Sequence, residues 1–495
     1  MNFNLLEEKL FDYGSGGYYL IESFLLELLR LEAASSGNYL VTEERNSKSR
    51  FDAYAPNGLA EINHPLAIEI VHSISPNKFK SIIDWHKKYI RSEYESLLII
   101  SMREIKGSSY FEKLSGNFNG RIFFWGRNEI QGLIDKHTVE AEKLVNKLFS
   151  IRFKQAISRS SEDWKEQRKE VIKEVAYHYN SGRFSMMLGA GVSSSAGLPD
   201  WDTLLNSLFV SMLTDDGLGE KKTENDQISS IVRRLREIDG PSALMLARYL
   251  RKGLSSGSSE EQSKFIESVT NQLYALRNKR FSINSPLIKS IASLCTPSRT
   301  GARVKSVLTY NFDDLLEREL LDRGLSYKSI FEEIDLAGPE ELPIYHVHGF
   351  LPEDRTVYPN IDQSTLVFSE EGYHQIYGEA YHWSNLIQLN SLKETACLMV
   401  GLSLTDPNLR RLLEISAKSL DKPKHFAFLK RIDYEEFSKE EGKSVVKASA
   451  NTVRTFLERH HSLNEEVMRE LGVNIIWYES YDEIPRILKE IAKSI

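Results

Sequence analysis

The chain has 495 residues, more than one ordinary hydrophobic core can hold, so two or more domains are expected. Its 41% hydrophobic and 27% charged residues are typical of a soluble globular protein, and a formal charge of −7 argues against a dominant electrostatic grip on nucleic acid. No apolar run approaches the roughly 20 residues that span a bilayer. The acidic start, MNFNLLEEKLFDYG, lacks the basic and apolar regions of a signal peptide. We therefore expect a cytoplasmic protein without membrane contact.

Residues 1–150 form one compositional unit, which we interpret as a smaller α/β domain. A long helical pattern, GYYLIESFLLELLRLEAA, opens it, with apolar residues on a helical period. Strand-like runs follow at 38–42, 66–71, 97–101 and 121–125. A charged helical pattern, DWKEQRKEVIKEVAYHY, then leads out of this unit, and we predict a linker helix over 151–182.

Residues 183–495 show a different pattern, in which separated apolar strands alternate with long helices. Six strands are predicted, at 184–188, 304–309, 343–347, 396–400, 425–429 and 473–478. Nearly continuous apolar runs bounded by helices indicate a parallel sheet that is covered on both faces. Residues from about 207 to 290 read instead as helices and polar loops, which predicts a helical insert. The fold class is therefore α/β.

Four of these strands end in polar clusters, at 189–193, 310–314, 348–349 and 401–406. In an open α/β sheet, ligands bind in the crevice outside the carboxyl ends of the strands. Glycines such as those of the Gly-Ala-Gly turn let a backbone approach a pyrophosphate, and the following helix N-terminus supplies N–H donors. The four clusters together predict one ligand site at this edge.

Each cluster also has a purely structural interpretation. A tight strand–helix turn explains a Gly-Ala-Gly sequence without any ligand. Asn311 and Asp313 could cap a helix, and so could Ser403 and Asp406, because these residue types favour the N-cap. A lone histidine before a glycine is more often structural than catalytic. The functional interpretation depends on the joint occurrence of the clusters in this order.

The blocks GAGVSSSAGLPDW, TYNFDD, HVHG and GLSLTDPNLRRLL, in that order, resemble the signatures of the sirtuin-like superfamily. The resemblance covers residues from about 180 to 480 and is closest to a bacterial branch that depletes NAD in antiphage defence. It implies a Rossmann-type parallel sheet with the helical insert. It also implies NAD⁺ as the substrate.

The resemblance assigns a role to each block. Asn311 would orient the reacting ribose or water, Asp313 would bond the nicotinamide carboxamide, and His348 would be the general base. We prefer His348 to His346, which precedes it by two residues on a strand and is expected on the same face. The implied cofactor-binding residues hold the diphosphate (Gly189, Ala190, Gly191, Ser193), close over the nicotinamide ribose (Asp200, Trp201) and contact the adenosine half (Gly401, Ser403, Asp406).

Two departures from the superfamily pattern bear on the reaction. Protein deacylases of this superfamily usually carry Gln before the Asn and a four-cysteine zinc module, whereas here Tyr310 takes the Gln position. The only cysteines, Cys295 and Cys397, lie far apart in apolar surroundings, so four thiolates cannot meet and zinc is not expected. Water is then favoured over an acyl-lysine as nucleophile. The resemblance implies an NAD⁺ glycohydrolase that releases nicotinamide and ADP-ribose, with a protein deacylase as the alternative.

The N-terminal 150 residues resemble the restriction-endonuclease-like fold more weakly. Glu22 in the first helix, Asp52 after a polar turn and Glu69 in the strand LAIEIV suit its metal-binding carboxylates. Val71 stands where the catalytic Lys is expected, so the domain is interpreted as degenerate. The carboxylates could still bind Mg²⁺. A metal-dependent nuclease or a DNA-sensing module remains the other alternative for this chain.

Unregulated NAD⁺ hydrolysis would be toxic to the cell, so we expect activity to depend on assembly or on a trigger. The resemblance implies a homo-oligomer, and an effector of antiphage defence that causes growth arrest or death by abortive infection. A HerA-type ATPase, a phage-derived trigger and DNA are the partners considered.

Overall fold

The computed structural model describes two compact units. The first comprises residues 1–167, 417–423 and 432–472, and the second comprises 168–416, 424–431 and 473–495. Within them the described residues are 1–11, 16–42, 51–86, 96–105, 111, 118, 120–158, 164–200, 203–208, 230–231, 234, 259–299, 301–358, 361, 364, 366–367, 379, 381–418, 420, 422–440 and 442–493.

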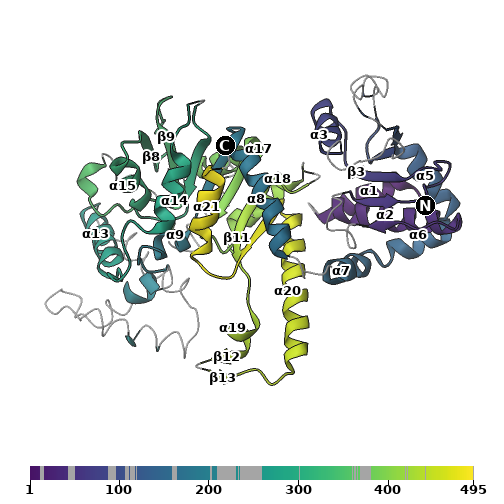
Figure 1. Ribbon diagram of the computed structural model, residues 1–495. Helices are drawn as coiled ribbons and strands as arrows, with labels where there is room; N and C mark the ends of the chain where they lie inside the picture. The colour runs from purple at the N-terminus through teal and green to yellow at the C-terminus, as the bar shows by residue number, and fades with distance from the viewer. Residues whose placement is uncertain are drawn as a thin grey trace. The chain divides into compact units, whose positions relative to one another are not determined.

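Seven parallel strands form the sheet of the second unit, in the order β14-β11-β10-β6-β7-β9-β8 (Figure 1). They are β6 (Phe184–Leu188), β7 (Val304–Thr309), β8 (Tyr327–Ile330), β9 (Leu342–His346), β10 (Ala396–Val400), β11 (His425–Lys430) and β14 (Val473–Tyr478). The predicted parallel α/β sheet is confirmed, and six of its strands lie where the sequence placed them. The seventh, β8, is a short edge strand whose first two residues are only half-buried, so it lacks the apolar run of a central strand.

Helices pack on this sheet, and its central strands β6 and β10 are buried at every position. Alternate residues of β6 and β10, such as Met186 and Leu398, share one core with residues of α8 (Trp164–Asn180), α14 (Pro286–Cys295) and α21 (Glu483–Lys493). The other helices of this unit are α9 (Ala190–Ser194), α13 (Ser259–Ala275), α15 (Leu315–Asp322), the 3-10 helix η2 (Arg355–Val357), α17 (Trp383–Glu394) and α18 (Pro407–Ala417).

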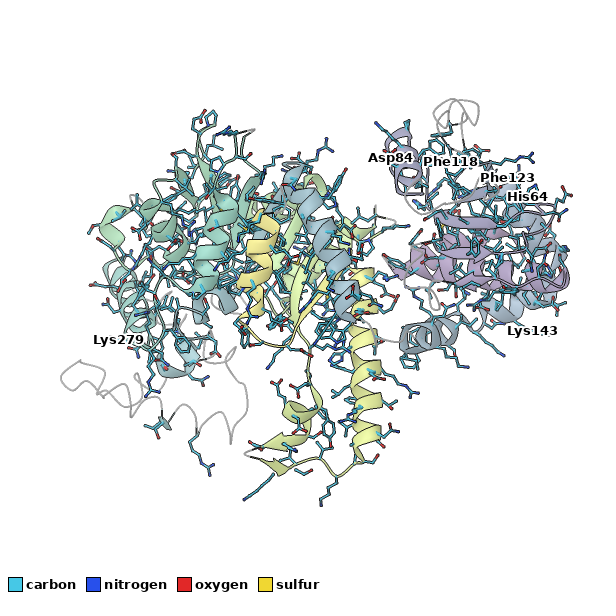
Figure 2. The ribbon with its side chains drawn as sticks, viewed as in Figure 1. His64, Asp84, Phe118, Phe123, Lys143 and Lys279 are labelled. Atoms are coloured by element: carbon cyan, nitrogen blue, oxygen red, sulfur yellow. The ribbon has the colours of Figure 1, made fainter. Side chains whose placement is uncertain are left out.

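The first unit contains a five-stranded mixed sheet in the order β1-β2-β3-β4-β5. Strands β1 (Val41–Thr42), β2 (Ala53–Ala55) and β3 (Leu66–Val71) are antiparallel, and β4 (Ser96–Ser101) and β5 (Ile122–Trp125) continue parallel to β3. Alternate residues of β3 and β4 face α2 (Gly16–Ser35), and Phe123, labelled in Figure 2, packs partly buried against that core. The remaining alternate residues pack against Phe79 of α3 (Pro76–His86).

A segment near the C-terminus completes the first unit. It contains α19 (Tyr434–Ser438), β12 (Lys439–Glu440), β13 (Lys443–Ser444) and α20 (Ala450–Glu470). In α20, Glu466 forms a buried ion pair with Arg152, and the Tyr19 hydroxyl donates to the Arg469 carbonyl oxygen at 3.0 Å. The other helices are α1 (Phe3–Phe11), α5 (Arg127–Lys136), α6 (Thr138–Val145) and α7 (Leu148–Ser158).

The compact units differ from the domains proposed from sequence. In the predicted linker, residues 151–158 belong to α7 in the first unit, and residues 164–180 form α8, most of which lies in the second unit. The first unit also includes residues 417–423 and 432–472, which in the sequence lie between strands of the second unit's sheet. Most of the predicted helical insert at 207–290 lies outside the described residues, and its described part includes α13 and the start of α14. Within the described chain, a helix with the length and apolar character for crossing a membrane is not found.

Candidate functional site

The Gly-Ala-Gly turn lies between β6 and α9 and is hydrogen-bonded to the turn that follows β10. The Gly189 N–H donates to the Val400 carbonyl oxygen and the Gly191 N–H donates to that of Gly401, both at 3.0 Å. The N–H groups of Gly189 and Gly191, which were expected to face a diphosphate, therefore donate to the chain at the end of β10 instead. Ala190 is the exposed residue of the turn.

Glycine is required here by the close approach of these two turns. A Cβ at Gly191 would lie 2.8 Å from the Gly401 Cα, and a Cβ at Gly401 would lie 2.7 Å from the Val192 nitrogen. Gly401 also has φ +71°, a left-handed conformation that disfavours other residues. The glycines thus serve backbone packing, which is a different use from the close approach to a ligand expected from sequence.

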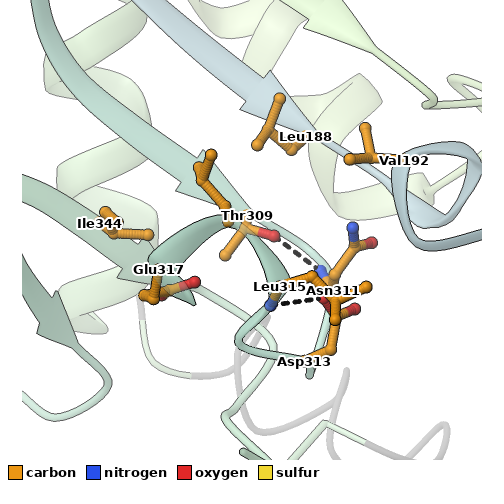
Figure 3. A pocket seen from close by; sticks show the side chains of 9 residues that line it. Leu188, Val192, Thr309, Asn311, Asp313, Leu315, Glu317 and Ile344 are labelled. Atoms are coloured by element: carbon orange, nitrogen blue, oxygen red, sulfur yellow. Dashed lines mark hydrogen bonds between the residues drawn. The ribbon is translucent and has the colours of Figure 1, made fainter. Parts of the chain in front are cut away.

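Asn311 and Asp313 follow β7 and connect it to the glycine turn. The Asn311 Nδ2 donates to the Gly189 carbonyl oxygen at 3.0 Å, and its backbone N–H donates to the Thr309 hydroxyl at 3.0 Å. The Ser193 hydroxyl of α9 donates to Asp313 Oδ2, and the Leu315 N–H donates to Oδ1 at 3.2 Å. Figure 3 shows Asn311 and Asp313 next to each other at the end of this strand. The predicted clusters at 189–193 and 310–314 therefore meet.

Burial dominates the electrostatics of Asp313. It raises the pKa of this carboxyl to about 6, against the hydrogen bonds from Ser193 and Leu315, which lower it. Asp313 is therefore mostly ionised at neutral pH but protonated in mild acid. Its ionised form can accept a hydrogen bond from an amide N–H.

His348 lies just beyond β9, between Tyr310 and Asp406. The His348 and Tyr310 rings meet edge to face, with centroids 4.7 Å apart and an interplanar angle of 80°. The Tyr310 hydroxyl donates to Gln388 Oε1 of α17. The His348 Nε2 lies 4.0 Å from Asp406 Oδ2. Burial lowers the pKa of His348, while the Asp406 carboxylate raises it.

His346 occupies a separate environment from His348. Its Nε2 contacts Glu317 Oε1 at 2.7 Å, and its ring lies on Phe350 with centroids 3.9 Å apart. The strand ends at His346, so the alternation of a strand does not carry over to His348. The Nδ1 of His346 lies 3.3 Å from the Asn311 carbonyl oxygen, whereas His348 approaches Asp406 of the turn that follows β10.

That turn contains the residues predicted to contact adenosine. Asp406 caps α18, because its Oδ1 accepts the Leu409 N–H at 2.7 Å. The exposed Ser403 hydroxyl lies 2.6 Å from the Thr405 hydroxyl. Asp406 therefore has the capping role that its sequence position allowed, and also approaches His348.

Asp200 is an exposed residue whose Oδ1 accepts the Thr203 N–H at 2.7 Å. This hydrogen bond caps the short helix that follows. Trp201, predicted beside it in the loop over the nicotinamide ribose, lies outside the described residues.

A small pocket with room for about one water molecule lies at the carboxyl ends of β6 and β7 (Figure 3). Its lining combines apolar side chains with Asn311, Asp313 and two further polar groups, and comprises Leu188, Val192, Thr309, Asn311, Asp313, Leu315, Leu316, Glu317 and Ile344.

The N-terminal carboxylates are each engaged with a different partner. Asp52 Oδ2 accepts the Ile70 N–H at 2.6 Å, and Glu69 Oε2 lies 2.8 Å from Lys422 Nζ. The Oε2 of Glu22 lies 4.0 Å from the Nη1 of Arg152. Burial raises the pKa of Asp52, and the nearby Glu69 raises it further. In the described part of the chain, no group of three Asp, Glu, His or Cys side chains is arranged to hold a metal ion. The three carboxylates nevertheless lie near one another, because Glu69 and Glu22 both raise the pKa of Asp52.

Sequence reasoning did not find three of these contacts, two beside His348 and one at Glu69. Gln388 lies in an ordinary helical pattern, and Tyr310 was noted only as a departure from the deacylase pattern. Lys422 is 353 residues from Glu69, so no local pattern could pair them.

The cysteines match their expected buried state. Burial raises the pKa of Cys295 to about 12 and that of Cys397 to about 11.

Two comparisons with known proteins agree with this geometry. The family model of the SIR2-like domain matches residues 305–453, which include Asn311, His348 and Asp406. The chain is also similar to the NAD(+) hydrolase ThsA of Enterococcus faecium, with 21% identity over 337 residues. That similarity covers 66% of this chain and 58% of the relative, so the chain spans less than two thirds of that protein. Residues 305–453 of this chain are therefore similar to the SIR2-like domain.

Proposed function

We propose that this protein is an NAD⁺ hydrolase that releases nicotinamide and ADP-ribose. One observation carries the proposal: Asn311 and Asp313 meet the glycine turn at the carboxyl edge of a parallel sheet, and His348 contacts Tyr310 beside them. The similarity to a protein named NAD(+) hydrolase supports the choice of substrate.

The substrate would lie along the loops at this edge. In the proposal the diphosphate follows the turn at 189–193, where Ala190 is exposed, and the adenosine half lies toward the loop 401–406. Asp200 and Trp201 would belong to the loop over the nicotinamide ribose. The nicotinamide end would lie beside Asn311 and Asp313, where its carboxamide can donate a hydrogen bond to the ionised Asp313.

The reaction breaks the bond between the ribose C1′ and the nicotinamide nitrogen, and the electron pair of that bond leaves with nicotinamide. Water forms the new bond to C1′ and loses one proton, so NAD⁺ and water give nicotinamide, ADP-ribose and H⁺. Burial keeps His348 neutral near pH 7 and therefore able to accept that proton. Asn311 would orient the ribose or the water.

A direct test is the formation of nicotinamide from NAD⁺ by the full chain, with and without candidate activators. His348→Ala should abolish turnover and leave thermal unfolding unchanged. His64→Ala is the matched control, because His64 is an exposed histidine of the first unit (Figure 2). Wild-type turnover in the His348→Ala protein would overturn the mechanism.

We further propose that the enzyme is a regulated effector of antiphage defence that acts by depleting NAD⁺. Because unregulated depletion would be toxic to the cell, its activity would depend on assembly into a homo-oligomer or on a trigger. Support comes from the resemblance of the motif blocks to such proteins. Cells that carry the wild-type protein should lose NAD⁺ on phage infection, and cells that carry His348→Ala should not. Retention of NAD⁺ in both strains during an infection that the wild type resists would contradict this role.

A HerA-type ATPase and a phage-derived trigger remain candidate partners in this proposal. Co-purification of the tagged full chain, followed by nicotinamide assays with and without the recovered partner, would test them. A metal-dependent nuclease or DNA-sensing module and a protein deacylase stay the alternatives to this proposal.

A further inference from the structure

The Asp406 carboxylate is held so that its two oxygens face different groups. Oδ1 accepts the Leu409 N–H at 2.7 Å and caps α18, whereas Oδ2 lies 4.0 Å from the Nε2 of His348. The helix cap fixes the carboxylate plane. The N-terminus of α18 also favours a negative charge at this position. Asp406 is therefore a fixed anion directed at an imidazole.

His348 is held from a second direction by Tyr310. The Tyr310 ring meets the imidazole at 80°, and its hydroxyl donates to Gln388, whose Nε2 donates to the Ser384 carbonyl oxygen at 3.0 Å. Tyr310 and Asp406 are thus two titratable groups that approach His348 from different elements.

We propose that Asp406 is a positioning residue for His348, holding the imidazole with its proton on Nε2 and stabilising the imidazolium formed during the reaction. This inference rests on the proposed function. It gives Asp406 a role in the chemical step, whereas the sequence resemblance placed it at the adenosine half.

The proton transfers follow from this arrangement. With Nε2 protonated toward Asp406, the lone pair of Nδ1 is left to accept the proton of the attacking water. The imidazolium then carries one proton on each ring nitrogen, with the Nε2 proton directed at the Asp406 carboxylate. The proton on Nδ1 passes to solvent after ADP-ribose forms. A separation of 4.0 Å is too long for a hydrogen bond, but catalytic contacts commonly tighten when substrate binds.

Asp406→Asn tests this role because Asn also caps helices and removes only the charge. We expect kcat to fall about 10- to 100-fold, less than the loss of the general base itself, with KM for NAD⁺ nearly unchanged. Asp406→Ser, another capping residue, should behave alike. Asp433→Asn is the matched control, since Asp433 caps α19 through the Glu436 N–H at 2.9 Å, outside the site.

The pH dependence provides a readout that a purely structural role would not change. The Asp406 carboxylate raises the pKa of His348, so its removal lowers that pKa. His348 must be neutral to act, and activity is lost as pH falls through its pKa. The acid limb of the kcat/KM profile should therefore move to lower pH.

A titration of the His348 ring by NMR, in protein labelled at histidine and assigned with His348→Ala, measures the same pairing without substrate. Asp406→Asn should lower the midpoint. Unchanged kcat, or an unchanged midpoint, would overturn the proposal, and so would a raised KM with unchanged kcat, which would make Asp406 a binding group. If the wild-type protein forms no nicotinamide, the proposed function fails, while the titration still decides whether Asp406 and His348 interact.

Discussion

The contact between the two glycine turns leads to a quantitative prediction for Gly401→Ala. Alanine at φ +71° costs about 1–2 kcal/mol of backbone strain. Its Cβ would also lie 2.7 Å from the Val192 nitrogen and 3.0 Å from the Gly189 carbonyl oxygen, and both are backbone atoms that cannot rotate away. Such overpacking costs about 1–3 kcal/mol more. We expect a total destabilisation of about 3 kcal/mol.

Gly324→Ala separates the two contributions. Gly324 has φ +67°, and a Cβ there would meet nothing within 4 Å, so this variant carries the strain without the clash. Both residues belong to the second unit, so urea unfolding should report the same transition for each variant. We expect Gly324→Ala to lose about 1 kcal/mol and to keep its activity.

Activity should distinguish the variants more strongly than stability does. A shift of the turn at Gly401 moves the acceptor of the Gly191 N–H and the loop that leads to Asp406. Nicotinamide release by Gly401→Ala should therefore fall at least tenfold at temperatures where the protein is folded. Equal losses of stability in the two variants, or full activity in Gly401→Ala, would refute the argument that this close packing builds the site.

Three further predictions concern buried charges. Burial raises the pKa of Asp313 in the folded protein from 3.8 to about 6, so the folded state binds a proton more tightly than the unfolded state. The free energy of unfolding, measured in urea and compared with that of Asp313→Asn, should therefore fall by about 3 kcal/mol as pH rises from 4 through 6. Arg152→Ala and Glu466→Ala should each destabilise the first unit, and their double-mutant cycle should yield a coupling of about 2 kcal/mol; additivity would contradict the buried ion pair. Glu317→Ala removes the 2.7 Å partner of buried His346 and should cost about 1–3 kcal/mol in thermal unfolding, whereas an unchanged midpoint would show that the pair does not stabilise the fold.

The central strands could be predicted from sequence because burial on both faces leaves a local signature. Every residue of β6, β10 and β3 is buried, and each appears in the sequence as a short apolar run. Short, partly buried strands carry no such run, so β8 and the three-residue β2 were missed. The polar clusters after the strands were also predictable, because parallel strands bring their carboxyl ends to one edge.

The tertiary structure decided which of those polar groups meet, because contacts between distant segments leave no periodic pattern in the chain. Only the fold places Asp406 against His348, and Lys422 against Glu69. It also joins α20 to the N-terminal helices through Arg152 and Glu466. The sequence by itself determined the strand pattern and the edge where the site lies, since both depend on local burial and strand direction. The partners within the site depend on how the turns pack, which only the folded chain specifies.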